Sequence, residues 1–151
     1  MNWINLFGLG IVILMLLPNV LYAIRIKTFE NKCRNKVMNM FEQVGRYGSL
    51  FFMVFNIGFY EYGFRSNEAY VIWLFVMIIL LSIYWFFWYL FFKKPHTNLP
   101  IILAILPSAI FIFSGCLLCH WLLIISGILF SIGHIYVTYS NNHANHEFYR
   151  K

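Results

Sequence analysis

Residues 99–140 read LPIILAILPSAIFIFSGCLLCHWLLIISGILFSIGHIYVTYS and contain no Lys, Arg, Asp or Glu. As one α-helix this stretch would be about 60 Å long, twice the ~30 Å thickness of the hydrocarbon core of a bilayer. The stretch must therefore fold back on itself. Glycine favours a helix end, so Ser114-Gly115 marks the expected turn. We predict two membrane spans here, over residues 99–117 and 121–139.

The rest of the chain has the same apolar character. Of its 151 residues, 62% are hydrophobic and 11% are charged, whereas soluble domains carry roughly 45–50% apolar and ~25% charged residues. This composition excludes a water-soluble fold, and the high hydrophobicity excludes intrinsic disorder. Three further apolar stretches lie at residues 3–24, 47–64 and 70–92. We predict an all-α, polytopic integral membrane protein in which residues 1–151 form one transmembrane domain, a bundle of five transmembrane helices.

The basic residues are divided unevenly between the two sides that these spans define. Arg65 lies on one side, and the other ten lie on the opposite side: Arg25, Lys27, Lys32, Arg34, Lys36, Arg46, Lys93, Lys94, Arg150 and Lys151. Lys and Arg in short loops are retained in the cytoplasm. We therefore expect an outer N-terminus, with the loop 25–46 and the tail 140–151 in the cytoplasm; in a bacterium the membrane would be the plasma membrane. The +6 net charge then reflects topology, and it indicates the lipid bilayer as the partner and not nucleic acid.

The loop between the first two predicted spans has the periodicity of an amphipathic helix. Its apolar residues recur at spacings of three or four: Ile26, Phe29, Cys33, Val37, Met40 and Val44. Such a stripe, with basic residues beside it, is typical of a helix that lies on an anionic membrane surface. We expect a cytoplasmic interfacial helix within residues 25–46.

Four polar side chains fall at a similar depth in the inner half of the membrane. They are Asn19, Glu42, Arg46 and His134. Ionisable groups at such a depth tend to face the bundle interior or a watery pocket, so these residues are candidates for a ligand-binding site. The alternative is structural, because Asn and His also join membrane helices by hydrogen bonds.

The sequence Cys116-Leu-Leu-Cys119-His120 falls at the predicted outer turn between the last two spans. Its C-x-x-C-H pattern matches that of c-type haem attachment. A pair of outer cysteines also resembles the thiol pair of quinone-reducing, disulfide-forming membrane enzymes, although here the third thiol, Cys33, lies on the cytoplasmic side. Two small buried apolar residues, or an incidental disulfide, are the remaining interpretation.

Two further patterns concern assembly and metal binding. Gly127 and Ser131 are four residues apart in the last span and would let another helix approach closely, either within the chain or in a homo-oligomer. The tail contains His143, His146 and Glu147, but not in the order of a zinc-protease motif. We expect a solvated tail and no metal site.

No pattern indicates a particular reaction. The chain has no glycine-rich phosphate loop and no Ser-His-Asp set, and its sequence assigns no cofactor. The leading hypothesis is a binding, transport-assisting or regulatory membrane component. One alternative is a membrane enzyme, or a binder of lipid or small molecules, with a polar site in the inner leaflet. A second is a thiol redox protein that uses Cys116 and Cys119.

Overall fold

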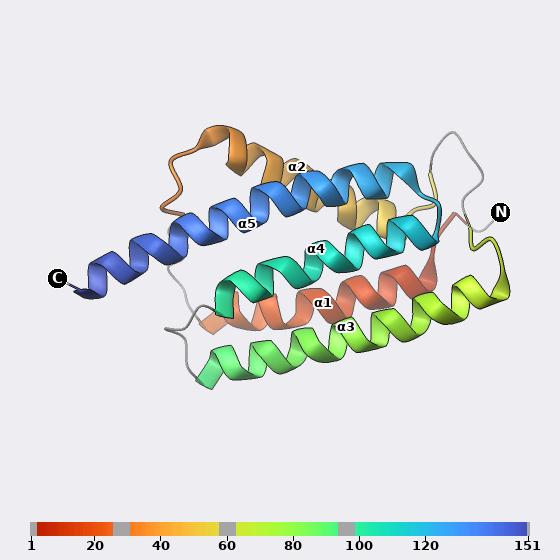
Figure 1. Cartoon of the computed structure of the whole chain (residues 1–151), viewed down its shortest axis with the longest axis horizontal. Helices are drawn as coiled ribbons and strands as arrows, with labels where there is room; N and C mark the ends of the chain where they lie inside the picture. The colour runs from red at the N-terminus through yellow and green to blue at the C-terminus, as the bar shows by residue number, and fades with distance from the viewer. Residues whose placement is uncertain (1–2, 26–30, 58–62, 94–98, 151) are drawn as a thin grey trace.

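The computed structural model describes the backbone of residues 3–25, 31–57, 63–93 and 99–150, and the side chains of these residues as far as residue 144. The described chain forms five helices: α1 (Leu6–Arg25), α2 (Lys36–Val54), α3 (Asn67–Lys93), α4 (Leu99–Leu117) and α5 (Trp121–Arg150). Successive helices run in opposite directions along one long axis (Figure 1). The fold is therefore all-α, as predicted.

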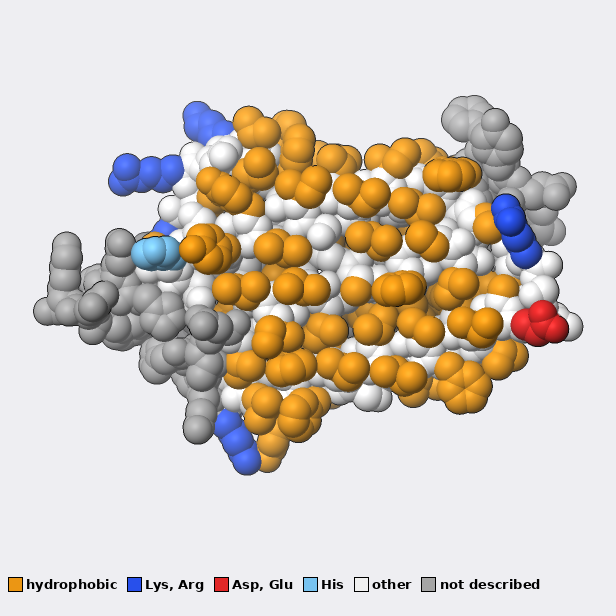
Figure 2. Space-filling model, in the orientation of Figure 1, with side chains coloured by type: hydrophobic (Ala, Val, Ile, Leu, Met, Phe, Trp, Pro, Cys, Tyr) orange, Lys and Arg blue, Asp and Glu red, His pale blue; other side chains and the backbone are white. Residues whose placement is uncertain are grey.

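Four of the helices are long and apolar enough to cross a membrane. They are α1, α3, α4 and the Trp121–Ala144 part of α5. Their large apolar side chains are exposed over much of the surface. Figure 2 shows apolar side chains covering the middle of the molecule, with Lys, Arg and Glu side chains near its two ends. An apolar belt between charged ends is what a bilayer requires. The four candidate spans thus indicate a multi-pass membrane protein.

The helix α2 differs from the prediction. A cytoplasmic interfacial helix and a second span were expected in succession, but one helix over Lys36–Val54 replaces them. Residues 31–35 are not helical, and the predicted stripe residues Ile26 and Phe29 lie outside the described residues. Arg46, which was assigned to a cytoplasmic loop, lies within α2.

Asparagine capping explains where α2 begins. The Asn35 side chain accepts hydrogen bonds from the backbone N–H groups of Val37 and Met38, which would otherwise have no acceptor in the first turn. At the other end, Phe55 has extended backbone angles and pairs in an isolated β-bridge with Ile4. The helix therefore ends within the predicted second span, 47–64.

Glycines bring α2 and α5 into close backbone contact. A Cβ atom at Gly133 would overlap the backbone of Glu42, and one at Gly45 would overlap the backbone of Phe130. A Cβ atom at Gly48 would lie 3.0 Å from the Cβ of Ser126. Small residues at such positions let membrane helices approach closely, so this glycine-lined seam positions the polar groups of the two helices.

Tryptophan side chains join α3 to its neighbours. Pro18 lacks an N–H group, so the carbonyl of Leu14, four residues earlier, has no intrahelical donor. Nε1 of Trp85 donates a hydrogen bond to this carbonyl at 3.2 Å. Nε1 of Trp73, which is buried, donates to Oγ of Ser114 on α4 at 3.0 Å. These contacts satisfy polar groups that lipid could not.

Candidate functional site

The carboxylate of Glu42 is the centre of a three-residue polar cluster at the α2–α5 seam. Its Oε1 accepts a hydrogen bond from Nη2 of Arg46, one helical turn later on α2. The same oxygen lies 2.9 Å from Nδ1 of His134 on α5. The structure therefore brings together three of the four residues predicted to form a site.

The surroundings of the cluster fix the positions of the acid and the imidazole. Glu42 faces Gly133 of α5, which has no side chain, so the two helix backbones are close here. The Glu42 side chain is 11% exposed. The ring of His134 stacks on the ring of Phe130, with the centroids 4.6 Å apart and the planes 16° from parallel. Arg46 is more open, with 42% of its side chain exposed, and His134 is 22% exposed. The acid is thus enclosed while the two basic groups remain accessible.

Asn19, the fourth residue, takes part in a different contact. Its Nδ2 donates hydrogen bonds to the carbonyl of Met15 at 2.9 Å and to the hydroxyl of Tyr84 at 2.7 Å. The first bond lies within α1, and the second joins α1 to α3. Asn19 therefore bonds to α3, whereas Glu42 contacts α5, and a ligand site shared by the two residues stays a prediction.

The cluster can bind an acidic group. Because an ionised carboxylate only accepts hydrogen bonds, Nδ1 of His134 carries the proton in the contact with Glu42. In that tautomer Nε2 of the imidazole is a hydrogen-bond acceptor. Arg46 has further N–H donors besides the one bonded to Glu42. A carboxylic or phosphoric acid matches both groups, because its O–H group can donate a hydrogen bond to Nε2 while another of its oxygens accepts from the guanidinium.

The second candidate site, Cys116 and Cys119, lies in the tight turn between α4 and α5. The N–H of His120 donates to the carbonyl of Gly115 at 2.8 Å, and that of Cys119 donates to the carbonyl of Cys116 at 3.3 Å. This pair of bonds is the Schellman motif that ends many helices. Cys119 has φ +54°, in the left-handed region that glycine usually occupies. Both thiols are free.

His120 caps α5 and does not present its ring to a ligand. Its Nδ1 accepts a hydrogen bond from the N–H of Leu123 at 3.3 Å, and the residue is fully buried against the ring of Phe52. Burial lowers the pKa of His120, because the imidazolium loses hydration, while backbone hydrogen bonds with Phe55 and within His120 itself oppose this shift. A haem attached here would need this imidazole as its iron ligand, so the residues present do not fit c-type haem attachment.

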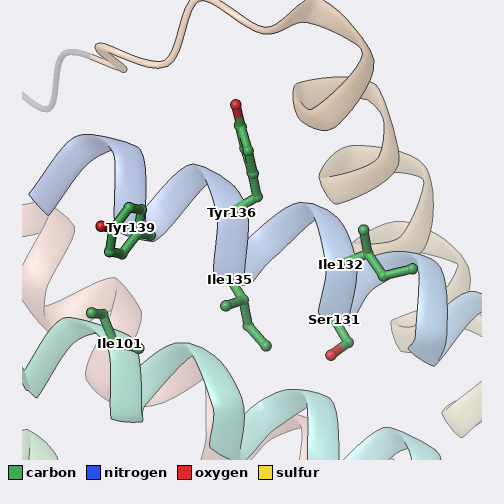
Figure 3. Close-up of a pocket in the computed structure, with 6 residues that line it drawn as sticks. All are labelled: Ile101, Ser131, Ile132, Ile135, Tyr136 and Tyr139. Carbon is green, nitrogen blue, oxygen red and sulfur yellow. The ribbon is translucent and has the colours of Figure 1, made fainter. Parts of the chain in front are cut away.

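The Gly127 and Ser131 face of α5 has two different environments. Gly127 is buried, and a Cβ atom there would lie 3.1 Å from a side-chain carbon of Ile112 on α4. Ser131 lines a shallow, mainly apolar groove of about 500 Å³ between α4 and α5 (Figure 3). Gly127 therefore packs against α4 within the chain. Packing within the chain was one of the two roles expected for this face.

The predicted tail continues α5 as far as Arg150 and is not a separate segment. The side chains of His146 and Glu147 lie outside those that the structure describes. His143 is exposed and contacts the ring of Tyr139. Among the described residues, no group of three His, Cys, Asp or Glu side chains could hold a metal ion.

Sequence reasoning missed a set of asparagine contacts at the start of α2. Oδ1 of Asn141 on α5 accepts from the N–H of Lys32 at 2.9 Å. Nδ2 of Asn39 donates to the carbonyl of Cys33 at 3.0 Å, and Nδ2 of Asn31 donates to Oδ1 of Asn39 at 2.9 Å. Asn35, placed before a run of helical periodicity, was a readable capping signal. The contact from Asn141 could be found only in the folded chain.

Comparisons with known proteins identify no relative. No protein-family model matches the chain, and neither the curated proteins nor the solved structures include a match to it. Function must therefore be inferred from the geometry.

Proposed function

We propose that α2 is a fifth membrane-spanning helix. Its polar and small residues, including Glu42, Gly45 and Ser49, are buried. Its exposed face carries the large apolar side chains Val37, Met40, Val44, Tyr47 and Phe51. A helix that lies on the membrane surface keeps its polar face in water, whereas the polar face of α2 is buried and contacts α5. An apolar outer face and a polar inner face suit a helix surrounded by lipid.

We propose further that the end of the bundle where α1 finishes and α2 begins faces the cytoplasm. The described basic residues at this end are Arg25, Lys32, Arg34, Lys36 and Lys93. Arg65 and Glu68 lie at the opposite end, beside the start of α3. The positive-inside rule supports this orientation, which places the N-terminus outside.

Within this arrangement we propose that the protein binds an amphiphile with an acidic head group, a carboxylate or a phosphate, at Arg46 and His134. One observation supports this most directly: Glu42 orients both basic groups through one oxygen, and both remain partly exposed. An acidic head group that donates a hydrogen bond to Nε2 of His134 and accepts from the guanidinium of Arg46 would contact both groups at once. The site lies among membrane helices, so its ligand needs an apolar tail as well.

Binding of defined amphiphiles tests this function. The probes are oleate for a carboxylate, an acyl glycerol phosphate for a phosphate, and lysophosphatidylcholine as the zwitterionic comparison, measured by native mass spectrometry of the full chain in detergent. We expect Arg46→Gln and His134→Gln each to weaken acid binding tenfold or more, because a hydrogen bond to a charged group contributes about 1.5–3 kcal/mol. Binding of one acid but not the other would identify the head group.

Arg34→Gln is the matched control. Arg34 is an exposed arginine at the cytoplasmic end and is not part of the cluster, so its loss should leave binding within twofold. Lysophosphatidylcholine that binds as tightly as oleate would contradict the proposal. So would equal losses from Arg34→Gln and Arg46→Gln, since these would indicate general attraction to the basic end. Thermal melting of each variant separates loss of binding from loss of folding.

A further inference from the structure

The two cysteines in the turn between α4 and α5 are open to their surroundings. Cys116 is exposed and Cys119 is half-buried, whereas Cys33 is buried. Free cysteines in folded proteins are among the most buried residues. Cys33 follows that pattern, but the pair in the turn does not, so core packing does not explain the pair.

The turn places the two residues within bridging distance. The hydrogen bond of 3.3 Å from the N–H of Cys119 to the carbonyl of Cys116 closes a four-residue turn. The Cα atoms at the ends of such turns lie less than about 7 Å apart. Disulfides join residues whose Cα atoms are usually about 4.4–6.8 Å apart, so the Cα separation in this turn suits a disulfide.

The backbone at Cys119 is a second observation that separates this residue from a packing role. Its φ of +54° lies in the left-handed region at the position after the end of α4. Glycine is the usual residue there, because it has no Cβ to clash with the chain. Backbone preference therefore does not account for a cysteine at this position.

We propose that Cys116 and Cys119 form a reversible intramolecular disulfide. In the orientation proposed above, the turn faces the outside of the cell, where disulfides persist. The oxidant is a low-molecular-weight disulfide, RSSR. The thiolate of one cysteine attacks RSSR, which forms a mixed disulfide and releases one RSH; the second thiolate then attacks the bound protein sulfur and releases the second RSH. The two protein thiols lose two electrons and two protons. RSSR takes up these electrons and protons and becomes two RSH.

The neighbouring histidine does not activate either thiol, so oxidation depends on disulfide exchange with an external disulfide. His120 is adjacent in sequence, but its Nδ1 already accepts from the N–H of Leu123 and its ring is buried. It therefore cannot serve as a base for either thiol. This separates the pair from a catalytic dithiol whose thiolate is generated by a neighbouring imidazole.

Oxidised glutathione is the probe for the test. The full chain, purified in detergent, is incubated with an excess of oxidised glutathione, denatured and treated with N-ethylmaleimide, and its peptides are analysed by mass. We expect the peptide with Cys116 and Cys119 to lose two hydrogens and take no label, while Cys33 takes one label after denaturation. Reduction before labelling should restore two labels on that peptide.

Single variants provide the matched controls. In Cys116→Ser and Cys119→Ser the remaining thiol should stop at the mixed disulfide with glutathione. Two labelled thiols, or a stable mixed disulfide in the unaltered chain, would overturn the proposal, because ring closure would then be unfavourable. The side of the membrane is tested separately by an impermeant maleimide on whole cells after mild reduction. Labelling from the outside supports the outer location, whereas labelling only after lysis would contradict the orientation and the environment inferred from it.

Discussion

Glu42 on α2 and His134 on α5 meet across the helix seam, with Oε1 of the acid 2.9 Å from Nδ1 of the imidazole, although 92 residues separate them along the chain. Arg46 contacts the same carboxylate oxygen. The three side chains therefore share one set of contacts. A substitution at one of them should change how much a substitution at another alters the free energy of unfolding.

The Glu42 and Arg46 side chains should be energetically coupled. Removing either charge alone leaves its partner poorly solvated beside lipid, so each single variant, Glu42→Gln or Arg46→Gln, should lower the free energy of unfolding more than the double variant does. Because Arg46 is partly exposed, we expect a coupling energy of at least about 1 kcal/mol and not the full value of a buried pair. Thermal or denaturant unfolding in detergent measures it. Additive effects would mean that the pair is only a surface contact.

The glycine seam should tolerate no side chain. Gly133→Ala and Gly45→Ala place a methyl group into the backbone of the facing helix, and we expect each to lower the free energy of unfolding by about 1–3 kcal/mol. Gly10→Ala is the matched control, since nothing lies within 4 Å of its added Cβ, and it should raise stability by about 0.5–1 kcal/mol. An equal loss at Gly10 would show that contact with the facing helix is not the cause of the losses at Gly45 and Gly133.

The cap at His120 should make stability depend on pH. Burial lowers the pKa of His120, so below about pH 6.5 the unfolded chain binds a proton that the folded chain does not. The free energy of unfolding should therefore be highest above that pH and fall as the pH is lowered toward the folded-state pKa. His120→Asn keeps a capping acceptor but does not titrate. Its unfolding free energy should fall less between pH 7.5 and 5.5 than that of the unaltered chain, and an equal fall would refute the assignment.

Glycine should be preferred to cysteine at position 119 in the reduced protein. Left-handed backbone costs an L-residue roughly 1–2 kcal/mol, so Cys119→Gly should raise the free energy of unfolding by about 1 kcal/mol under reducing conditions. Cys116→Gly, within the last turn of α4, should lower it by about the same amount. Thermal unfolding in excess reductant compares the two, and a gain at position 116 would be inconsistent with this turn geometry.

Labelling from each side of the membrane should distinguish the two ends of α3. In a background without native cysteines, Asn67→Cys should react with an impermeant maleimide on whole cells, and Lys93→Cys should react only after lysis. The two residues are the first and last of α3. The opposite pattern would reverse the proposed orientation.

The sequence alone determined the broad architecture, because membrane insertion depends on local composition. The run over residues 99–140 predicted two helices with a turn between them, and α4 and α5 lie there. The turn was expected at Ser114-Gly115, but both residues lie within α4, and the turn follows at residues 118–120. The helix class and the candidate spans of α1, α3, α4 and α5 likewise follow from apolar length. Each of these properties is set by residues close together along the chain.

Only the tertiary structure decided the course of α2 and the grouping of polar residues. The helix α2 is not among the candidate spans, because its polar residues lower its mean hydropathy. In the structure its buried residues include Glu42 and Ser49, and its large apolar side chains are exposed. Asn19 and Glu42 lay at similar predicted depths, but the side chains bond to different helices, Asn19 to Tyr84 and Glu42 to His134. Depth follows from position along one helix, whereas contact depends on the rotation of each helix against its neighbours. That rotation is set here by glycines such as Gly133, whose role becomes visible only when the facing backbone is known.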